Sequence, residues 1–222
     1  MRKFFITISI LLLATFSYSQ DLGQVTFANG SKFSYYSFRT AQDVLIRVSE
    51  DGKVMEWGME VMSDRSNYYA PKLQPFMGRV EYYGPEDSVF KGKVKSIGTC
   101  FITYYDVYET AEKIGKLKTL GTLYFDYYSN YDEKSLRGKL KFAGSTFFEY
   151  YRTYENESFR GKLKSVGNSA ITYYSAFDDK RNAGKIKSIG AANYSWYSEF
   201  GRSGLKNGYY RQQIGSVTYI LN

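Results

Sequence analysis

The chain of 222 residues lacks one residue type on which common protein functions depend and has little of two others. It contains no histidine, one cysteine and three prolines. Without His, the commonest metal ligand and the usual general base are missing, together with every Ser-His or Cys-His nucleophile pair. Cys100 has no partner in the sequence, so an intrachain disulfide is excluded and stability must come from packing and sheet hydrogen bonds. These absences remove much of the ordinary chemistry of enzymes.

The first twenty residues predict export. Arg2 and Lys3 precede an apolar stretch from Phe4 to Phe16, and Ser17-Tyr18-Ser19 offers the small-x-small pattern of a cleavage site. The apolar stretch is too short to favour a membrane span, and no later segment is long enough to cross as a helix. We therefore predict residues 1–19 to be a signal peptide. The expected location is the periplasm, the cell surface or the extracellular space.

The charge of the chain is mildly basic. Thirty Lys and Arg residues exceed 22 Asp and Glu residues by 8, and loss of Arg2 and Lys3 with the leader leaves 28 − 22 = +6. An excess of this size attracts anionic polymers and also serves solubility. An anionic glycan or an envelope protein is therefore the expected class of partner. Nucleic acid is not, because an exported protein rarely meets it.

A repeat of 23 residues dominates the sequence. Five units open with a Gly-Lys motif, GKVKSIG, GKLKTLG, GKLKFAG, GKLKSVG and GKIKSIG, at Gly92, Gly115, Gly138, Gly161 and Gly184. Twelve residues after each opening Gly comes an aromatic pair: Tyr104-Tyr105, Tyr127-Tyr128, Tyr150-Tyr151, Tyr173-Tyr174 and Trp196-Tyr197. A fixed period of this kind indicates a repeat architecture, in which each unit packs mainly against its neighbours.

The second Gly of each unit predicts a tight turn. The pairs are Gly98-Thr99, Gly121-Thr122, Gly144-Ser145, Gly167-Asn168 and Gly190-Ala191. Gly in the first central position suits the type II′ turn of a two-residue β-hairpin. The segment from Gly23 to Phe38 lies three periods earlier (23 + 69 = 92) and carries Asn29-Gly30, which is the signature of a type I′ turn. Both solutions predict a hairpin.

Weaker copies of the unit fill the rest of the chain. They are predicted at Gly52–Val61, at residues 72–83 with Pro71 and Pro75 marking an edge position, and as a hairpin over Tyr209–Leu221. We therefore divide the mature chain into divergent N-terminal hairpins (20–91), regular repeats (92–207) and a C-terminal capping hairpin (208–222). The divergent ends are expected to face water, as terminal repeats do.

The direction of the strands follows from the lysines. A turn at Gly98-Thr99 places Ile97 opposite Cys100 and puts Lys93 and Lys95 on the same face as Ile97, so neither face is cleanly apolar. In a parallel β-solenoid these lysines would stack about 4.8 Å apart, at roughly 1 kcal/mol per neighbouring pair. In an antiparallel meander, aliphatic and aromatic residues separate them. The predicted fold is therefore all-β, an antiparallel β-hairpin repeat array in an extended meander, with a parallel β-solenoid as the alternative. The open ends of such an array are predicted to pair edge to edge with further copies.

Two columns of side chains are the candidate ligand-binding residues. They are the aromatics Tyr104, Tyr127, Tyr150, Tyr173 and Trp196 and the lysines Lys93, Lys116, Lys139, Lys162 and Lys185. Such columns could stack on sugar rings or attract an anionic glycan, or they could serve only to pair strands. The sequence thus predicts a non-enzymatic protein with a structural or adhesion role, and a glycan-binding module as the alternative.

Acidic residues gather in the segments that link the hairpins. They are Glu109, Glu112, Asp132, Glu133, Glu155, Glu157, Asp178 and Asp179. Their spacing lacks the alternating pattern of a calcium loop, and the paired carboxylates recur without the pocket that glycoside hydrolysis needs. We interpret them as solvated charge that balances nearby lysines, and we expect no metal and no cofactor.

In its period and hairpin habit, the array resembles MORN repeats. In its Gly-then-Tyr-Tyr pattern it is similar to choline- and glucan-binding cell-wall repeats, and its leader is similar to those of secreted Gram-negative repeat proteins. The motifs cover residues 92–197. They lack the internal glycine spacing of MORN repeats and the paired Trp sites of the cell-wall repeats, so no binding residue is carried over from either family.

Overall fold

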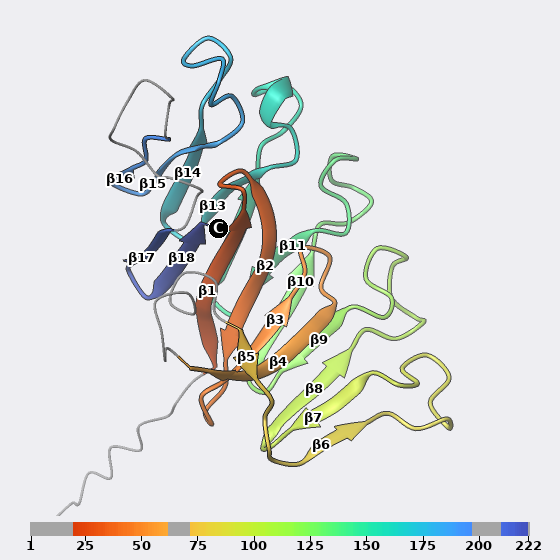
Figure 1. Ribbon diagram of the computed structural model, residues 1–222. Coiled ribbons are helices and arrows are strands. Elements are labelled where there is room, and N and C mark those ends of the chain that lie inside the picture. Colours follow the sequence, from red (N-terminus) through yellow and green to blue (C-terminus); the bar gives the residue numbers. More distant parts are fainter. Residues whose placement is uncertain (1–19, 62–71, 197–209, 222) are drawn as a thin grey trace, which may run out of the picture.

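The computed structural model describes residues 20–61, 72–196 and 210–221 (Figure 1). Within these residues the chain forms eighteen β-strands and one short 3₁₀-helix, η1 (Glu157–Phe159). The predicted all-β class is confirmed. The predicted signal peptide, residues 1–19, lies outside the described residues.

The first sheet joins the two ends of the chain. Its seven strands lie in the order β17-β18-β1-β2-β3-β4-β5. Their bounds are β1 Asp21–Ala28, β2 Lys32–Arg39, β3 Val44–Val48, β4 Val54–Glu60, β5 Leu73–Gln74, β17 Tyr210–Ile214 and β18 Val217–Leu221. The predicted C-terminal hairpin is therefore present as β17–β18. It lies beside β1, which pairs with β18 in parallel.

The second sheet contains the regular repeats. Its eleven strands follow one another in chain order from β16 to β6. Their bounds are β6 Val80–Tyr82, β7 Val94–Ile97, β8 Cys100–Tyr104, β9 Leu117–Leu120, β10 Leu123–Tyr127, β11 Leu140–Ala143, β12 Thr146–Tyr150, β13 Leu163–Val166, β14 Ser169–Tyr173, β15 Ile186–Ile189 and β16 Ala192–Asn193. All neighbours in this sheet pair antiparallel. The predicted meander is confirmed; a parallel solenoid is not formed. The sheet keeps two edges, so edge-to-edge association stays a prediction.

The predicted turns are confirmed by the backbone. The first glycine of each turn pair has a positive φ, between 52° at Gly167 and 58° at Gly144, as the first central residue of a type II′ turn requires. At Asn29-Gly30 both residues have positive φ, 52° and 62°, which is the type I′ geometry. The turn at Gly98 pairs Ile97 with Cys100 as predicted.

The prediction that neither face is cleanly apolar is wrong, and a β-bulge is the reason. Thr103 pairs with Thr119, whereas the next residue, Tyr104, pairs with Leu117, so Lys118 is an extra residue in its strand. The same shift recurs along the sheet, with Lys95, Lys141, Lys164 and Lys187 as the extra residues. A bulge reverses the alternation of side chains. Leu117 and Leu120 therefore both face inward with no exposed surface, and the inner face is apolar.

The apolar inner face packs against the first sheet. Phe38 of β2 meets Phe125 at 4.9 Å between ring centroids, and Tyr36 meets Phe148 at 4.5 Å. The N–H groups of Leu140 and Ile186 donate across the interface to the carbonyls of Glu50 and Gly30 in turns of the first sheet, each at 2.8 Å. Figure 1 shows the two sheets as layers around this shared core.

The divergent N-terminal segment differs from its prediction. Its central strand does not face water, because every residue of β3 is buried, whereas β4 has exposed residues. Gly58 makes no turn but lies within β4, where a Cβ would stand 2.2 Å from the carbonyl oxygen of Gln74. Residues 72–83 form no hairpin, because β5 is the edge strand of the first sheet and β6 belongs to the second. Pro75 follows that edge strand as predicted, and Pro71 lies outside the described residues.

Candidate binding surface

The predicted aromatic column lies inside the core. The exposed fractions of its rings are 7% for Tyr104, 1% for Tyr127, 2% for Tyr150, 3% for Tyr173 and 6% for Trp196. Stacking on a sugar requires an accessible ring face, and these rings have none. The column therefore serves packing between the two sheets, a structural role that differs from the strand pairing given above as the alternative to ligand contact.

The polar ends of these rings are hydrogen-bonded within the core. Tyr104, Tyr127, Tyr173 and Trp196 donate to the carbonyl ten residues earlier, at 2.7–3.0 Å. Tyr150 instead pairs with the hydroxyl of Tyr36, at 3.0 Å between the oxygens. Burial raises the pKa of the Tyr127 and Tyr150 hydroxyls well above the ordinary value, so both remain protonated.

The predicted lysine column joins successive units. The ammonium groups of Lys93, Lys116, Lys139 and Lys162 donate to the carbonyl of the Gly that opens the next unit, 22 residues ahead. All five lysines of the column, Lys185 included, lie over the aromatic ring of their own unit, 4.7–5.1 Å from its centroid. Burial lowers the pKa of Lys93, Lys116 and Lys162. These contacts stabilise the stack of hairpins and leave little of the column for an anionic ligand.

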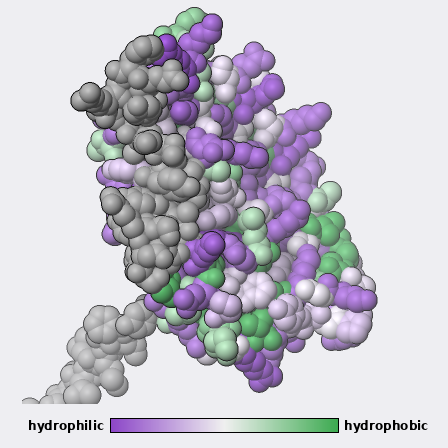
Figure 2. Space-filling view, in the orientation of Figure 1, coloured by the Kyte–Doolittle hydropathy of each residue, from purple (hydrophilic) through white to green (hydrophobic). Residues whose placement is uncertain are grey.

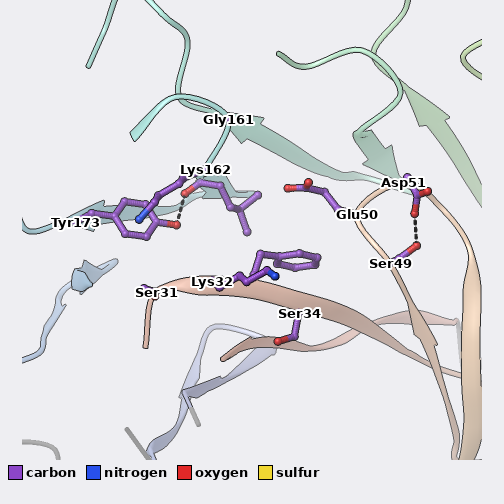
Figure 3. Close-up of a pocket in the computed structure, with 11 residues that line it drawn as sticks. Ser31, Lys32, Ser34, Ser49, Glu50, Asp51, Gly161, Lys162 and Tyr173 are labelled. Atoms are coloured by element: carbon purple, nitrogen blue, oxygen red, sulfur yellow. Dashed lines mark hydrogen bonds between the residues drawn. The ribbon is translucent and has the colours of Figure 1, made fainter. Parts of the chain in front are cut away.

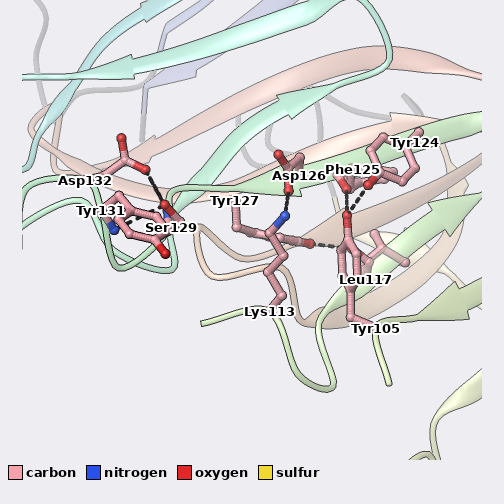
Figure 4. Close-up of polar contacts among 10 residues, drawn as sticks. All are labelled: Tyr105, Lys113, Leu117, Tyr124, Phe125, Asp126, Tyr127, Ser129, Tyr131 and Asp132. Carbon is pink, nitrogen blue, oxygen red and sulfur yellow. Dashed lines mark hydrogen bonds and ion pairs between the residues drawn. The ribbon is translucent and has the colours of Figure 1, made fainter. Parts of the chain in front are cut away.

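The second Tyr of each pair also joins neighbouring units. Tyr105, Tyr128, Tyr151 and Tyr174 donate to the carbonyl twenty residues ahead, at 2.7–3.0 Å. Figure 4 shows the Tyr105 hydroxyl between the Phe125 carbonyl and Tyr124. The residues that define the repeat in the sequence therefore hold the repeat together in the structure.

One recurring residue has no such role. The loops that link successive hairpins project from one long edge of the repeat sheet (Figure 1). Four of these loops carry an aromatic residue at the same position, so that it recurs every 23 residues. We call Tyr108, Tyr131, Tyr154 and Phe177 the tip aromatics. Their exposed fractions are 93%, 94%, 77% and 101%, respectively. Each is followed by an acidic residue, in Tyr-Glu, Tyr-Asp, Tyr-Glu and Phe-Asp.

The acidic residue beside each of the last three tips shapes its loop. The carboxylates of Asp132, Glu155 and Asp178 each accept the backbone N–H of the residue three positions earlier, at 2.7–3.1 Å. Figure 4 shows this contact between Asp132 and Ser129, with Tyr131 beside it. These backbone hydrogen bonds lower the pKa of Glu155 and Asp178, with Lys164 and Lys187 as ion-pair partners. The prediction that loop carboxylates balance lysines is confirmed for these two pairs.

The sequence contained a signal for the tip aromatics. Their period is the same 23 residues, but the doubled Tyr of each unit is the stronger pattern and is the one from which ligand contact was predicted. Exposure separates the two sets. A recurring aromatic that is buried is explained by packing, whereas one that is almost fully exposed at the same position of four loops is not.

A groove opens between the two sheets (Figure 3), with a volume of about 610 Å³. Ser31 and Lys32 line one side, Ser49 and Glu50 the middle, and Lys162 the other side. Two of the charged groups that line it already have partners, because Glu50 pairs with Lys139 at 2.9 Å and Lys162 binds the Gly184 carbonyl at 2.6 Å. Burial raises the pKa of Glu50. No tip aromatic lines this groove.

No protein-family model matches the chain. Comparison with curated proteins and comparison with solved structures likewise find no significant match.

The remaining candidate groups carry no site. Cys100 is 2% exposed, and burial raises the pKa of its thiol to about 11, so the thiol stays protonated and the side chain serves packing. Within the described ranges, no three His, Cys, Asp or Glu side chains come together as metal ligands. Those ranges also hold no helix that is long and apolar enough to span a membrane. The tip aromatics are the candidate binding surface.

Proposed function

We propose that the protein is an exported, non-enzymatic scaffold of the adhesion type, which presents a row of loops to a partner outside the cell. The observation that carries this proposal is the set of four tip aromatics, each at the same position of its loop and at least 77% exposed. An isolated ring in water contributes little to folding, so contact with a partner is the function that its recurrence favours.

The structural role of the other repeated residues supports the proposal that the protein is a scaffold. The first Tyr, the second Tyr and the first Lys of a unit make hydrogen bonds that hold strands and neighbouring units in place, as with Tyr127, Tyr128 and Lys116. Groups fixed in this way position the loops rather than react with a substrate. The leader pattern of residues 1–19 supports export.

Binding to isolated envelopes tests the proposal. The mature chain (20–222), immobilised on a sensor, is exposed to envelopes of the organism that produces it. A variant in which all four tip aromatics are replaced by Ala serves as the comparison. We expect the wild type to bind and the variant to lose binding while its circular dichroism spectrum stays unchanged. Equal binding by both proteins, or binding by neither, would overturn the proposal.

A further inference from the structure

We infer that the tip aromatics bind an uncharged, extended polysaccharide, with one sugar contact at each tip. This inference rests on the proposed function and adds the class of ligand. The separation of the rings, the charge of the loops and the regular period support it.

The separation of the tips argues against a compact ligand. Equivalent residues lie two strands apart, which is about 9.6 Å at the sheet, and the twist of the sheet fans the loops farther apart. A small molecule needs a concave pocket, and a protein partner buries its anchor residues in the close-packed centre of one continuous interface. Separate single rings provide neither, but they can each contact one unit of a long chain.

The charge of the loops argues against an anionic ligand. Counted from the second Tyr of one unit to the Gly that opens the next, three of the four loops hold two acidic and two basic residues each, and the first holds three acidic residues and one Lys. The Lys that follows each of these glycines lies over the aromatic ring of its own unit. An acidic residue also stands directly after every tip aromatic. Nucleic acids and anionic glycans are held through an excess of Lys or Arg, which these loops lack. Figure 2 shows hydrophilic residues predominating on the side where the loops project.

The chemistry that remains is that of a neutral sugar. The face of a pyranose ring carries C–H groups that lie flat on an aromatic side chain, while its hydroxyls donate to carboxylates such as Asp132 and Glu155 beside the rings. A polymer offers the same unit repeatedly, as the protein offers the same loop. Four weak contacts on one chain then add up to useful affinity through the high effective concentration of linked sites.

Native gels cast with single polysaccharides test this inference. Neutral glucans, mannans and soluble chitin oligomers are compared with alginate and polygalacturonate, and sedimentation with vesicles of phosphatidylcholine and phosphatidylglycerol supplies the membrane arm. We expect at least one neutral polymer to retard the wild type. Replacing all four tip aromatics by Ala should weaken that binding at least about 100-fold, and Tyr131→Ala by about tenfold. Tyr131→Trp should retain it.

The matched control is Phe101→Ala/Phe147→Ala. It removes two exposed rings, 64% and 58% accessible, from the outer face of the sheet rather than from the loops, and should leave retardation unchanged. Equal loss in this control would overturn the assignment to the tips. Retardation only by anionic polymers, or binding only to vesicles, would overturn the ligand class. If no polysaccharide binds while envelopes still do, the inference fails and the proposed function stands.

Discussion

The difference between the two recurring aromatics can be measured at two tyrosines four residues apart. Tyr127 is 1% exposed and donates to the Leu117 carbonyl at 2.7 Å, whereas Tyr131 is 94% exposed at a loop tip. Tyr127 also packs tightly beneath the other sheet, because a Cβ at Gly52 would stand 2.1 Å from its hydroxyl oxygen. Truncation of the two side chains should therefore have very different costs.

The expected magnitudes follow from burial. Tyr127→Ala leaves a cavity the size of a ring and should lower the free energy of unfolding by about 3–5 kcal/mol. Tyr127→Phe keeps the ring but removes the buried hydrogen bond, at about 1–2 kcal/mol. Tyr131→Ala should change stability by less than about 0.5 kcal/mol. In a chain of this length, Tyr127→Ala should lower the Tm by roughly 6–20 °C.

Urea unfolding followed by circular dichroism measures these differences. The midpoint should fall in the order Tyr131→Ala, Tyr127→Phe, Tyr127→Ala, with little change in the slope of free energy against urea concentration. Tyr131→Phe is the control for loss of a hydroxyl at the surface. Equal destabilisation by Tyr127→Ala and Tyr131→Ala would refute the assignment of one ring to the core and the other to the partner.

Three further predictions concern other parts of the fold. Tyr36→Phe and Tyr150→Phe should each lower the free energy of unfolding by about 1–2 kcal/mol, because each leaves a buried hydroxyl without its partner. The double variant should lose less than the sum of the two. Simple additivity in a double-mutant cycle would argue against the contact. Gly215→Ala should lower the free energy of unfolding by about 1–2 kcal/mol, because Ala must adopt the positive φ of that position. Gly30→Ala should lower it more, because its Cβ would also stand 1.7 Å from the Trp196 ring. Thermal melts of the two variants measure the difference. The thiol of Cys100, with its pKa raised to about 11, should react slowly with Ellman's reagent at pH 8 in the native protein and rapidly in guanidinium chloride; fast reaction of the folded protein would contradict its burial.

Much of the fold could be predicted from the sequence because its signals are local. In each regular unit, a Gly followed by a small residue makes the turn, as at Gly167-Asn168, where the Gly has a positive φ. The 23-residue period then places each hairpin beside the previous one. A simple electrostatic comparison of the lysines favoured the antiparallel meander over the parallel solenoid. The position of Lys93 over Tyr104, at 4.8 Å, is the contact that this comparison anticipated.

Other features depended on residues far apart in the chain. The bulge at Lys118 reverses the faces of its strand, and although it recurs with the 23-residue period, the alternation of residues within one strand does not reveal it. The covering sheet brings β1 beside β18, almost two hundred residues away, so burial of the Tyr127 column follows from a contact that the repeat does not encode. In the regular repeats, the sequence by itself determined where the chain turns and in which direction the strands run, because turn chemistry acts over a few residues. Only the tertiary structure decided which of the recurring rings are buried and which meet water, because burial depends on what packs on top.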